Sequence, residues 1–158
     1  MMDEYLLQTR GTTCLLIAGV NARVFYGMEI PGLREGEPRF LELAERHKCI
    51  NGGCLQWNRL FEELELGILE HAEPSPEWVR GELEAGRCVK LTISTPRANL
   101  HATLIVGYCG QLFECVNAQV HEPNVTLEWL DWEQLSAPPA DAHRRLPRGC
   151  FSVFPLLG

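Results

Sequence analysis

The sequence predicts an α+β domain in which helices come first and β-strands follow. Apolar residues recur at helical spacing in the first half of the chain, whereas residues 88–94, 101–108 and 111–116 are rich in residues that favour strands. Elements separated along the chain in this way are typical of α+β folds. With 158 residues, of which 46% are hydrophobic, the chain is long enough for a single domain, residues 1–158, with one core.

The first half is expected to be mainly helical. An apolar stretch follows the loop and capping residues Gly11-Thr12-Thr13, which predicts a buried helix with Cys14 at its N-terminus. Apolar side chains at three-four-three spacing predict a later amphipathic helix, and proline in a first turn predicts another. The expected helices are 14–25, 39–48, 54–66 and 77–85, with one strand at 68–71.

The second half is expected to form a β-sheet. Two of its strands are joined across Cys109-Gly110, where a glycine-containing turn favours a tight hairpin. A Pro-rich loop at 137–148 precedes an apolar segment that suits a last strand. The expected strands are 88–94, 101–108, 111–116 and 150–156, and the segments 126–130 and 132–135 are expected to add a strand or a helix at the edge. The helical and sheet parts would form two lobes with a cleft between them.

Charge and hydropathy exclude several classes of partner. The net charge of −7 and the absence of a basic run argue against a nucleic-acid partner. The acidic start does not resemble a signal peptide, and no apolar run approaches the roughly 20 residues that a membrane span needs. We therefore expect a cytoplasmic protein without membrane insertion.

The cysteines are expected to be mainly buried, reduced thiols. Seven is an odd number, and the cysteines are scattered through hydrophobic segments. Two pairs, Cys49 with Cys54 and Cys109 with Cys115, lack the spacing of a zinc site with a matching second half. The sequence implies no metal or organic cofactor.

Cys14 and His101 are the candidates for a nucleophile and its base. A thiol must ionise to attack near neutral pH, and a helix N-terminus and an adjacent imidazolium both lower the pKa of a thiol. Cys14 is expected at such a terminus, and His101 heads the strand that follows a loop at 95–100. Alone, the first could be a structural thiol and the second a histidine at a strand edge, so the prediction depends on the pair.

Asn117 is the candidate that orients the histidine. It closes the second strand of the hairpin, which returns the chain to the end where His101 begins. An ordinary turn residue is the alternative, in which case Glu114 or Glu122 would orient the imidazole.

Gln8 is the candidate for stabilising an oxyanion. It lies six residues before Cys14, so its side-chain amide is expected to act together with the Cys14 backbone N–H. The alternative is a surface residue that leads into the first helix.

Taken together, Gln8, Cys14, the strand from His101 to Tyr108, and Asn117 resemble the papain-like cysteine peptidases. The similarity covers roughly residues 5 to 120 and is closest to the bacteriocin-processing, double-glycine peptidase family in its stand-alone form. The resemblance implies that Cys14, His101 and Asn117 are catalytic and that Gln8 and Cys14 form the oxyanion hole. Two positions differ from the pattern, since Leu15 replaces a glycine and Asn117-Ala118 replaces Asp-Pro.

The resemblance also implies a fold and an activity. The fold would be papain-like and two-lobed, with a helical lobe at about 1–86 that carries the cysteine and an antiparallel sheet lobe at about 87–158 that carries the histidine. The activity would be hydrolysis of a peptide or amide bond through an acyl-enzyme, on a peptide or acyl-amide substrate. Two alternatives stay open: acyl transfer to an amine by the same pair, and a non-catalytic peptide- or protein-binding module in which Leu15 blocks attack.

Overall fold

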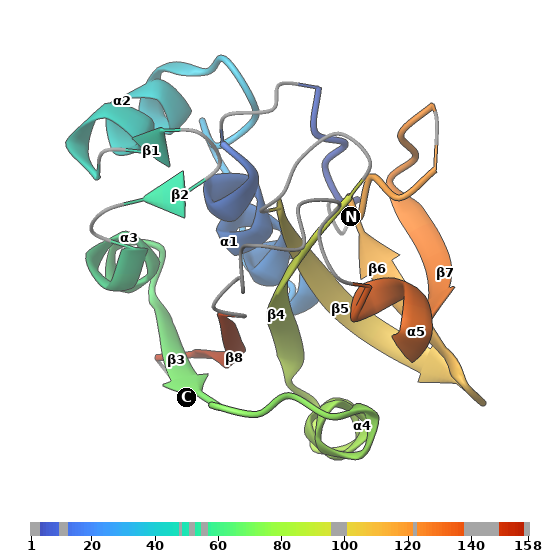
Figure 1. Cartoon of the computed structure of the whole chain (residues 1–158). Coiled ribbons are helices and arrows are strands. Elements are labelled where there is room, and N and C mark those ends of the chain that lie inside the picture. The colour runs from blue at the N-terminus through green and yellow to red at the C-terminus, as the bar shows by residue number, and fades with distance from the viewer. Residues whose placement is uncertain are drawn as a thin grey trace.

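The computed structural model describes residues 4–9, 13–47, 49–50, 53–54, 57–95, 101–121, 123–137 and 149–156. These residues form an α+β structure (Figure 1). The helices are α1 (Cys14–Phe25), α2 (Pro38–Arg46), α3 (Trp57–Glu63), α4 (Pro76–Glu84) and α5 (Trp132–Leu135). The strands are β1 (Cys49–Ile50), β2 (Gly53–Cys54), β3 (Leu66–Glu70), β4 (Cys88–Ile93), β5 (His101–Cys109), β6 (Leu112–Val116), β7 (Leu127–Asp131) and β8 (Cys150–Pro155).

Six of the strands form one antiparallel sheet in the order β3-β8-β4-β5-β6-β7. The predicted hairpin is present, because Cys109 pairs with Leu112 across a two-residue turn whose Gly110 has a φ of 61°. Strand β8 lies between β3 and β4 and so joins the last part of the chain to its middle. The class expected from the sequence, α+β, is therefore confirmed.

Helices cover both faces of this sheet. On one face α1 and α3, with Phe40 and Leu43 of α2, form a core with apolar side chains of β4, β5 and β8. On the other face, residues of α4 and α5 pack against the alternate side chains of the same strands. Strand β3 belongs to this sheet and α4 packs on it, although both precede residue 87. The layers therefore do not divide the chain into a helical part over 1–86 and a sheet part after it.

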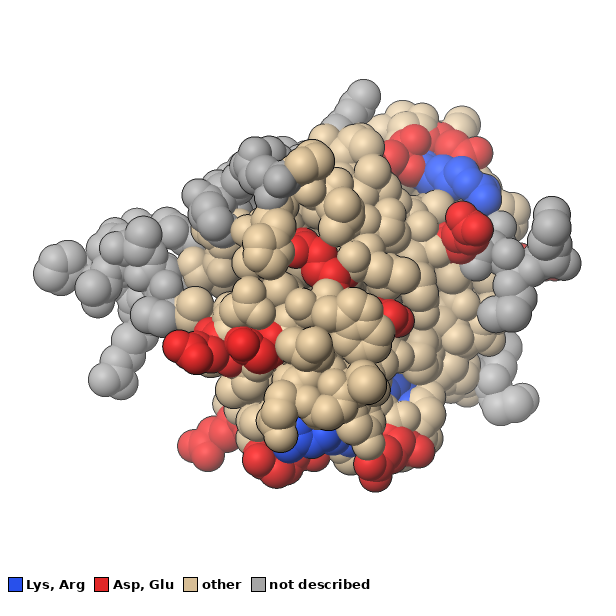
Figure 2. All heavy atoms as spheres, turned by 90° about the vertical axis from the view of Figure 1, so that its right-hand side faces the viewer, with Lys and Arg blue, Asp and Glu red and all other residues tan. Residues whose placement is uncertain are grey.

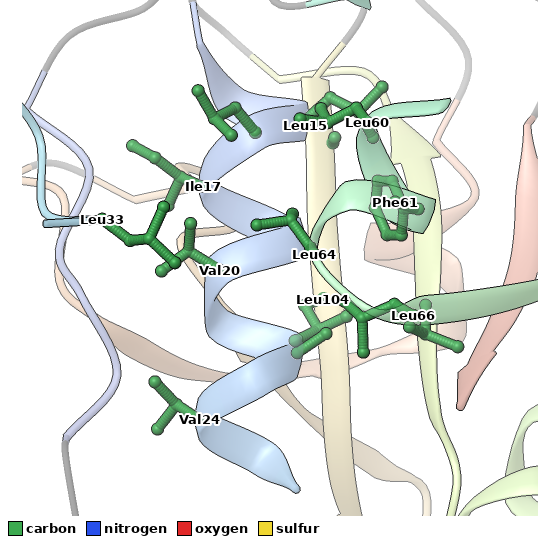
Figure 3. Close-up of a cluster of buried hydrophobic side chains, with 14 of the residues drawn as sticks. Leu15, Ile17, Val20, Val24, Leu33, Leu60, Phe61, Leu64, Leu66 and Leu104 are labelled. Carbon is green, nitrogen blue, oxygen red and sulfur yellow. The ribbon is translucent and has the colours of Figure 1, made fainter. Parts of the chain in front are cut away.

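Helix α1 is the central helix of the molecule. Ten of its 12 residues are buried, as expected for a helix that is apolar all round. Figure 3 shows its side chains meeting those of α3, β3 and β5. At Gly19 an added Cβ would lie 2.7 Å from Leu64 Cδ1, so the absence of a side chain there allows the close approach of the segment that ends α3.

Helix α3 is shorter than the sequence predicts. The expected helix covered 54–66, whereas α3 runs from Trp57 to Glu63, and Cys54 belongs to strand β2. Phe61 and Leu64 of the predicted apolar stripe are buried as expected. The stripe thus identified the core-facing side chains but not the ends of the helix, which are the least certain part of such a prediction.

Local capping explains the limits of α4. The Ser75 side chain accepts a hydrogen bond of 3.1 Å from the Trp78 N–H, and Pro76 occupies the first turn. The helix ends before Gly86, whose φ of 84° favours glycine. This helix was predicted at 77–85 and is confirmed.

The surface on the side of β6, β7 and α5 carries more acidic than basic side chains, in keeping with the net charge of −7 (Figure 2). On the edge strand β7, alternation leaves Trp129 47% exposed and buries Leu130 completely.

In the part of the chain that the structure describes, no helix has both the length and the apolar composition required to cross a membrane.

Candidate active site

Cys14 is the first residue of α1 and lies against the start of β5. Its side chain is 3% exposed. Its Sγ accepts a hydrogen bond from the backbone N–H of Ala102, with an N···S distance of 3.4 Å. The pairing of β5 with β6 ends at Leu104, before it reaches Ala102. The thiol therefore lies beside the peptide that joins His101 to Ala102.

His101 is the first residue of β5, and its ring is held by a backbone carbonyl. Its Nε2 lies 2.5 Å from the carbonyl oxygen of Asn117, and the side chain is buried. Because a carbonyl oxygen can only accept, Nε2 must carry the proton in this contact. In the neutral imidazole, Nδ1 then keeps its lone pair and is the nitrogen that can act as a base.

Burial sets the protonation states of both groups. It raises the pKa of the Cys14 thiol, an effect that the Ala102 N–H and the charge of Lys90 oppose only in part. It also lowers the pKa of His101, against the opposing effect of the Asn117 carbonyl. The sequence led us to expect a lowered pKa for the thiol beside an imidazolium, whereas burial shifts both groups the other way. The directions of both shifts favour a neutral thiol and a neutral imidazole.

Asn117 lies at the site, but its side chain does not orient His101. It follows β6 with a φ of 54°, a conformation that asparagine adopts more readily than most residues. Its carbonyl holds the imidazole, while its side chain bonds to the segment that precedes Cys14. Of the alternative partners, Glu114 pairs with Gly107, towards the other end of β5, and Glu122 lies outside the described residues.

Three asparagines hold the segment that contains Gln8, and one of them, Asn124, donates from Nδ2 to the Gln8 carbonyl over 3.2 Å. The Gln8 N–H donates to Asn117 Oδ1 over 2.9 Å, and Asn117 Nδ2 donates to the Leu6 carbonyl over 2.6 Å. Asn21 of α1 accepts from the Leu6 N–H at 2.7 Å and donates to its carbonyl at 3.1 Å. Gln8 is 3% exposed and is thus a buried residue, not a surface one. Its role in an oxyanion hole stays a prediction.

Leu15 belongs to the hydrophobic core. It is 6% exposed and belongs to the same core cluster as Leu60 of α3 (Figure 3). In the non-catalytic alternative, this leucine blocks attack by the neighbouring thiol. Its place in the core gives it a packing role between α1 and α3.

The Asn117→Asp substitution is expected to destabilise the protein by about 1–3 kcal/mol at pH 7. The introduced carboxylate would still accept from Gln8, but its second oxygen would face the Leu6 carbonyl without a hydrogen to donate. Burial raises the folded-state pKa of such a carboxyl group above its unfolded-state value of about 3.9. The loss in the free energy of unfolding is therefore absent below a pH of about 3.9 and reaches its full size above the folded-state pKa. Urea unfolding at pH 4 and pH 7 measures this difference.

Asn58→Asp is the matched control for this substitution. Asn58 is exposed on α3, and its Oδ1 accepts only from the neighbouring Arg59 N–H among the described contacts. The control should change stability by less than about 0.5 kcal/mol at either pH. Equal losses in the two variants would show that the Asn117 amide is not required.

The other cysteines of the described residues differ in their state. Cys49 is disulfide-bonded, an exception to the expected reduced thiols, and its Cα pairs with that of Cys54 across β1 and β2. The free cysteines are Cys14, Cys88, Cys109, Cys115 and Cys150, of which only Cys109 is exposed. Within the described residues, no three His, Cys, Asp or Glu side chains lie close enough together to hold a metal ion.

Sequence reasoning missed two buried polar residues. Asn21 is completely buried in α1, and Lys90 is 7% exposed in β4. Each is a polar residue inside an otherwise apolar run, and this is the signal that could have identified it.

Comparison with known proteins adds no family to this description. No protein-family model matches the chain, and no curated protein or solved structure shows significant similarity to it.

Proposed function

We propose that the chain is a cysteine hydrolase of peptide or amide bonds, of the papain-like, double-glycine peptidase type that its sequence resembles. The observation that carries the proposal is the placement of Cys14 against the His101–Ala102 peptide while the Asn117 carbonyl holds the far nitrogen of the His101 ring. A thiol at a helix N-terminus beside an oriented imidazole is the arrangement that nucleophilic catalysis by cysteine requires.

In the proposed reaction His101 moves the protons and Cys14 forms the covalent bond. Nδ1 accepts the thiol proton as Sγ attacks the carbonyl carbon, and the electron pair moves to the carbonyl oxygen. The Cys14 N–H and the Gln8 amide would stabilise this oxyanion. When it collapses, the C–N bond breaks and the imidazolium protonates the leaving amine. Water then attacks the thioester and gives a proton to His101, which returns it to sulfur as the C–S bond breaks.

Acylation of Cys14 by an activated acyl donor tests this function. The protein is incubated with the p-nitrophenyl ester of acetylglycine, and acyl adducts at each cysteine are quantified by peptide mass spectrometry. We expect an adduct at Cys14 that disappears with time and is absent from Cys14→Ala. The exposed Cys109 reports ordinary thiol reactivity in the same molecule. An adduct at Cys109 without one at Cys14 would refute the proposal.

A non-catalytic peptide-binding module is the second candidate, because Cys14 and His101 are each only 3% exposed. In that case Cys14 would stay unmodified while a peptide still bound. If acylation occurs, adding glycinamide during turnover distinguishes hydrolysis from acyl transfer, since a transferase would yield the acylated amide as its main product.

A further inference from the structure

Lys90 is a buried lysine on the face of the sheet that packs against α1. It pairs with Leu104 of β5 and Phe151 of β8, and both belong to the core that contains α1. Because directly paired residues of neighbouring strands share a face, the Lys90 side chain points towards α1. It is 7% exposed, and burial of an ammonium group is costly unless a partner compensates for it.

The ammonium of Lys90 is held in a defined position. Its Nζ donates to Thr92 Oγ1 at 2.7 Å and to the Gly149 carbonyl at 3.2 Å, and it lies 5.0 Å from the centre of the Phe151 ring. A Cβ on Gly149 would lie 3.0 Å from this nitrogen, so a glycine there lets the lysine reach the carbonyl.

This position is next to Cys14. Thr92, which accepts from Lys90, is the cross-strand partner of Ala102, and the Ala102 N–H is bonded to Cys14 Sγ. Lys90 and Cys14 therefore lie on the same side of the sheet, around one residue pair of β4 and β5.

Cys14 is the titratable group best placed to compensate the charge of Lys90. Besides Cys14, the groups whose charges act on Lys90 are Cys150 of β8 and Glu70 of β3. Cys150 packs in the core on the opposite face of the sheet, and burial raises its pKa to about 12. Glu70 is exposed and pairs with Phe151, which places it two strands from Lys90, about 10 Å away. Among the described residues, no carboxylate lies within ion-pair distance of Lys90.

We propose that Lys90 and Cys14 form a coupled ammonium–thiol pair, in which Lys90 is a positioning residue that stabilises negative charge on the Cys14 sulfur. Its importance for catalysis rests on the hydrolase function proposed above, because the charge develops when His101 removes the thiol proton. Burial lowers the pKa of Lys90 to about 8, so the ammonium is present at neutral pH and is lost as the pH rises past that value.

The alkylation rate of Cys14 as a function of pH tests this pair. Iodoacetamide rates at Cys14 and Cys109 are measured from pH 6 to pH 11 in wild type, Lys90→Met, Lys90→Arg and Arg59→Met. Two strongly coupled groups release their protons in two steps, so the wild-type profile of Cys14 should show two steps. Lys90→Met should show one step, shifted upward by about one pH unit, with a roughly tenfold lower rate at pH 7. Lys90→Arg, which keeps the charge, should restore most of the rate with a single step.

The controls separate the possible failures. Arg59→Met removes an exposed positive charge and should leave the Cys14 profile unchanged, and the exposed Cys109 should react alike in all four proteins. Circular dichroism establishes that each variant is folded. If Lys90→Met has the wild-type profile, Lys90 and Cys14 are not coupled, and this proposal fails. That result would leave the hydrolase proposal standing if Cys14 is acylated. If Cys14 is never acylated but the two-step profile is present, the hydrolase proposal fails and the pair stands.

Discussion

Replacement of His101 by glutamine is expected to lower the rate of Cys14 acylation by about 100- to 10,000-fold, the usual contribution of a general base. Glutamine can still donate a hydrogen bond to the Asn117 carbonyl, but it has no nitrogen that accepts the thiol proton. Burial raises the pKa of Cys14 and lowers that of His101, so little thiolate exists before attack. Without the base, the acylation rate should therefore fall by the whole contribution of proton transfer. Single-turnover acylation by the activated ester, followed by mass spectrometry, gives the rate.

His71→Gln is the matched control for this experiment. His71 stacks on Trp78 with a centroid distance of 4.2 Å, on the other side of the sheet from α1. The control should acylate at the wild-type rate. If the two variants are equally active, His101 is not the base.

Truncation of Phe61 is expected to cost about 3–5 kcal/mol of stability, as for other buried phenylalanines. Phe61 is 1% exposed and packs edge-on against Phe151, with ring centroids 5.4 Å apart. It lies between α1 and the sheet, where Phe61→Ala would leave a cavity that the rigid neighbours cannot fill (Figure 3). Urea unfolding monitored by circular dichroism measures the change.

Leu41→Ala is the control, because Leu41 is 51% exposed on α2. It should change the free energy of unfolding by less than about 0.5 kcal/mol. A loss below about 1 kcal/mol in Phe61→Ala would mean that the core between α1, α3 and the sheet does not depend on this ring.

Patterns confined to a short stretch of sequence predicted the elements best. Helix α1 begins at Cys14 and ends at Phe25 as the mainly apolar stretch indicates, and the hairpin of β5 and β6 follows from two strand-like runs around a glycine. The pairing of β3 with β8 joins segments some 85 residues apart, and no local pattern encodes it. This pairing makes β3 the edge strand of the sheet, although it precedes residue 87.

At the site, the sequence predicted that Asn117 meets His101 but not through which atoms. The hairpin explains why Asn117 returns to His101, yet only the turn conformation after β6 decides that a carbonyl, and not the side chain, reaches the imidazole. The structure also explains why an asparagine rather than an aspartate suits this position. The amide nitrogen of Asn117 donates to the Leu6 carbonyl, which a carboxylate cannot do. The directions of the pKa shifts depend on burial, which residue spacing alone does not reveal.

The bond between Gln8 and Asn117 spans 109 residues, which has a consequence for synthesis. At translation rates of about 5–20 residues per second, roughly 5–20 s separate the emergence of the donor from that of its acceptor. For most of that interval Ala102, whose N–H bonds to the Cys14 sulfur, has not emerged, and until its end Asn117 is not present to hold the His101 ring. The nascent chain thus carries an ordinary thiol, and its special environment arises only after contacts of high sequence separation have closed, the slow step for folds of this kind.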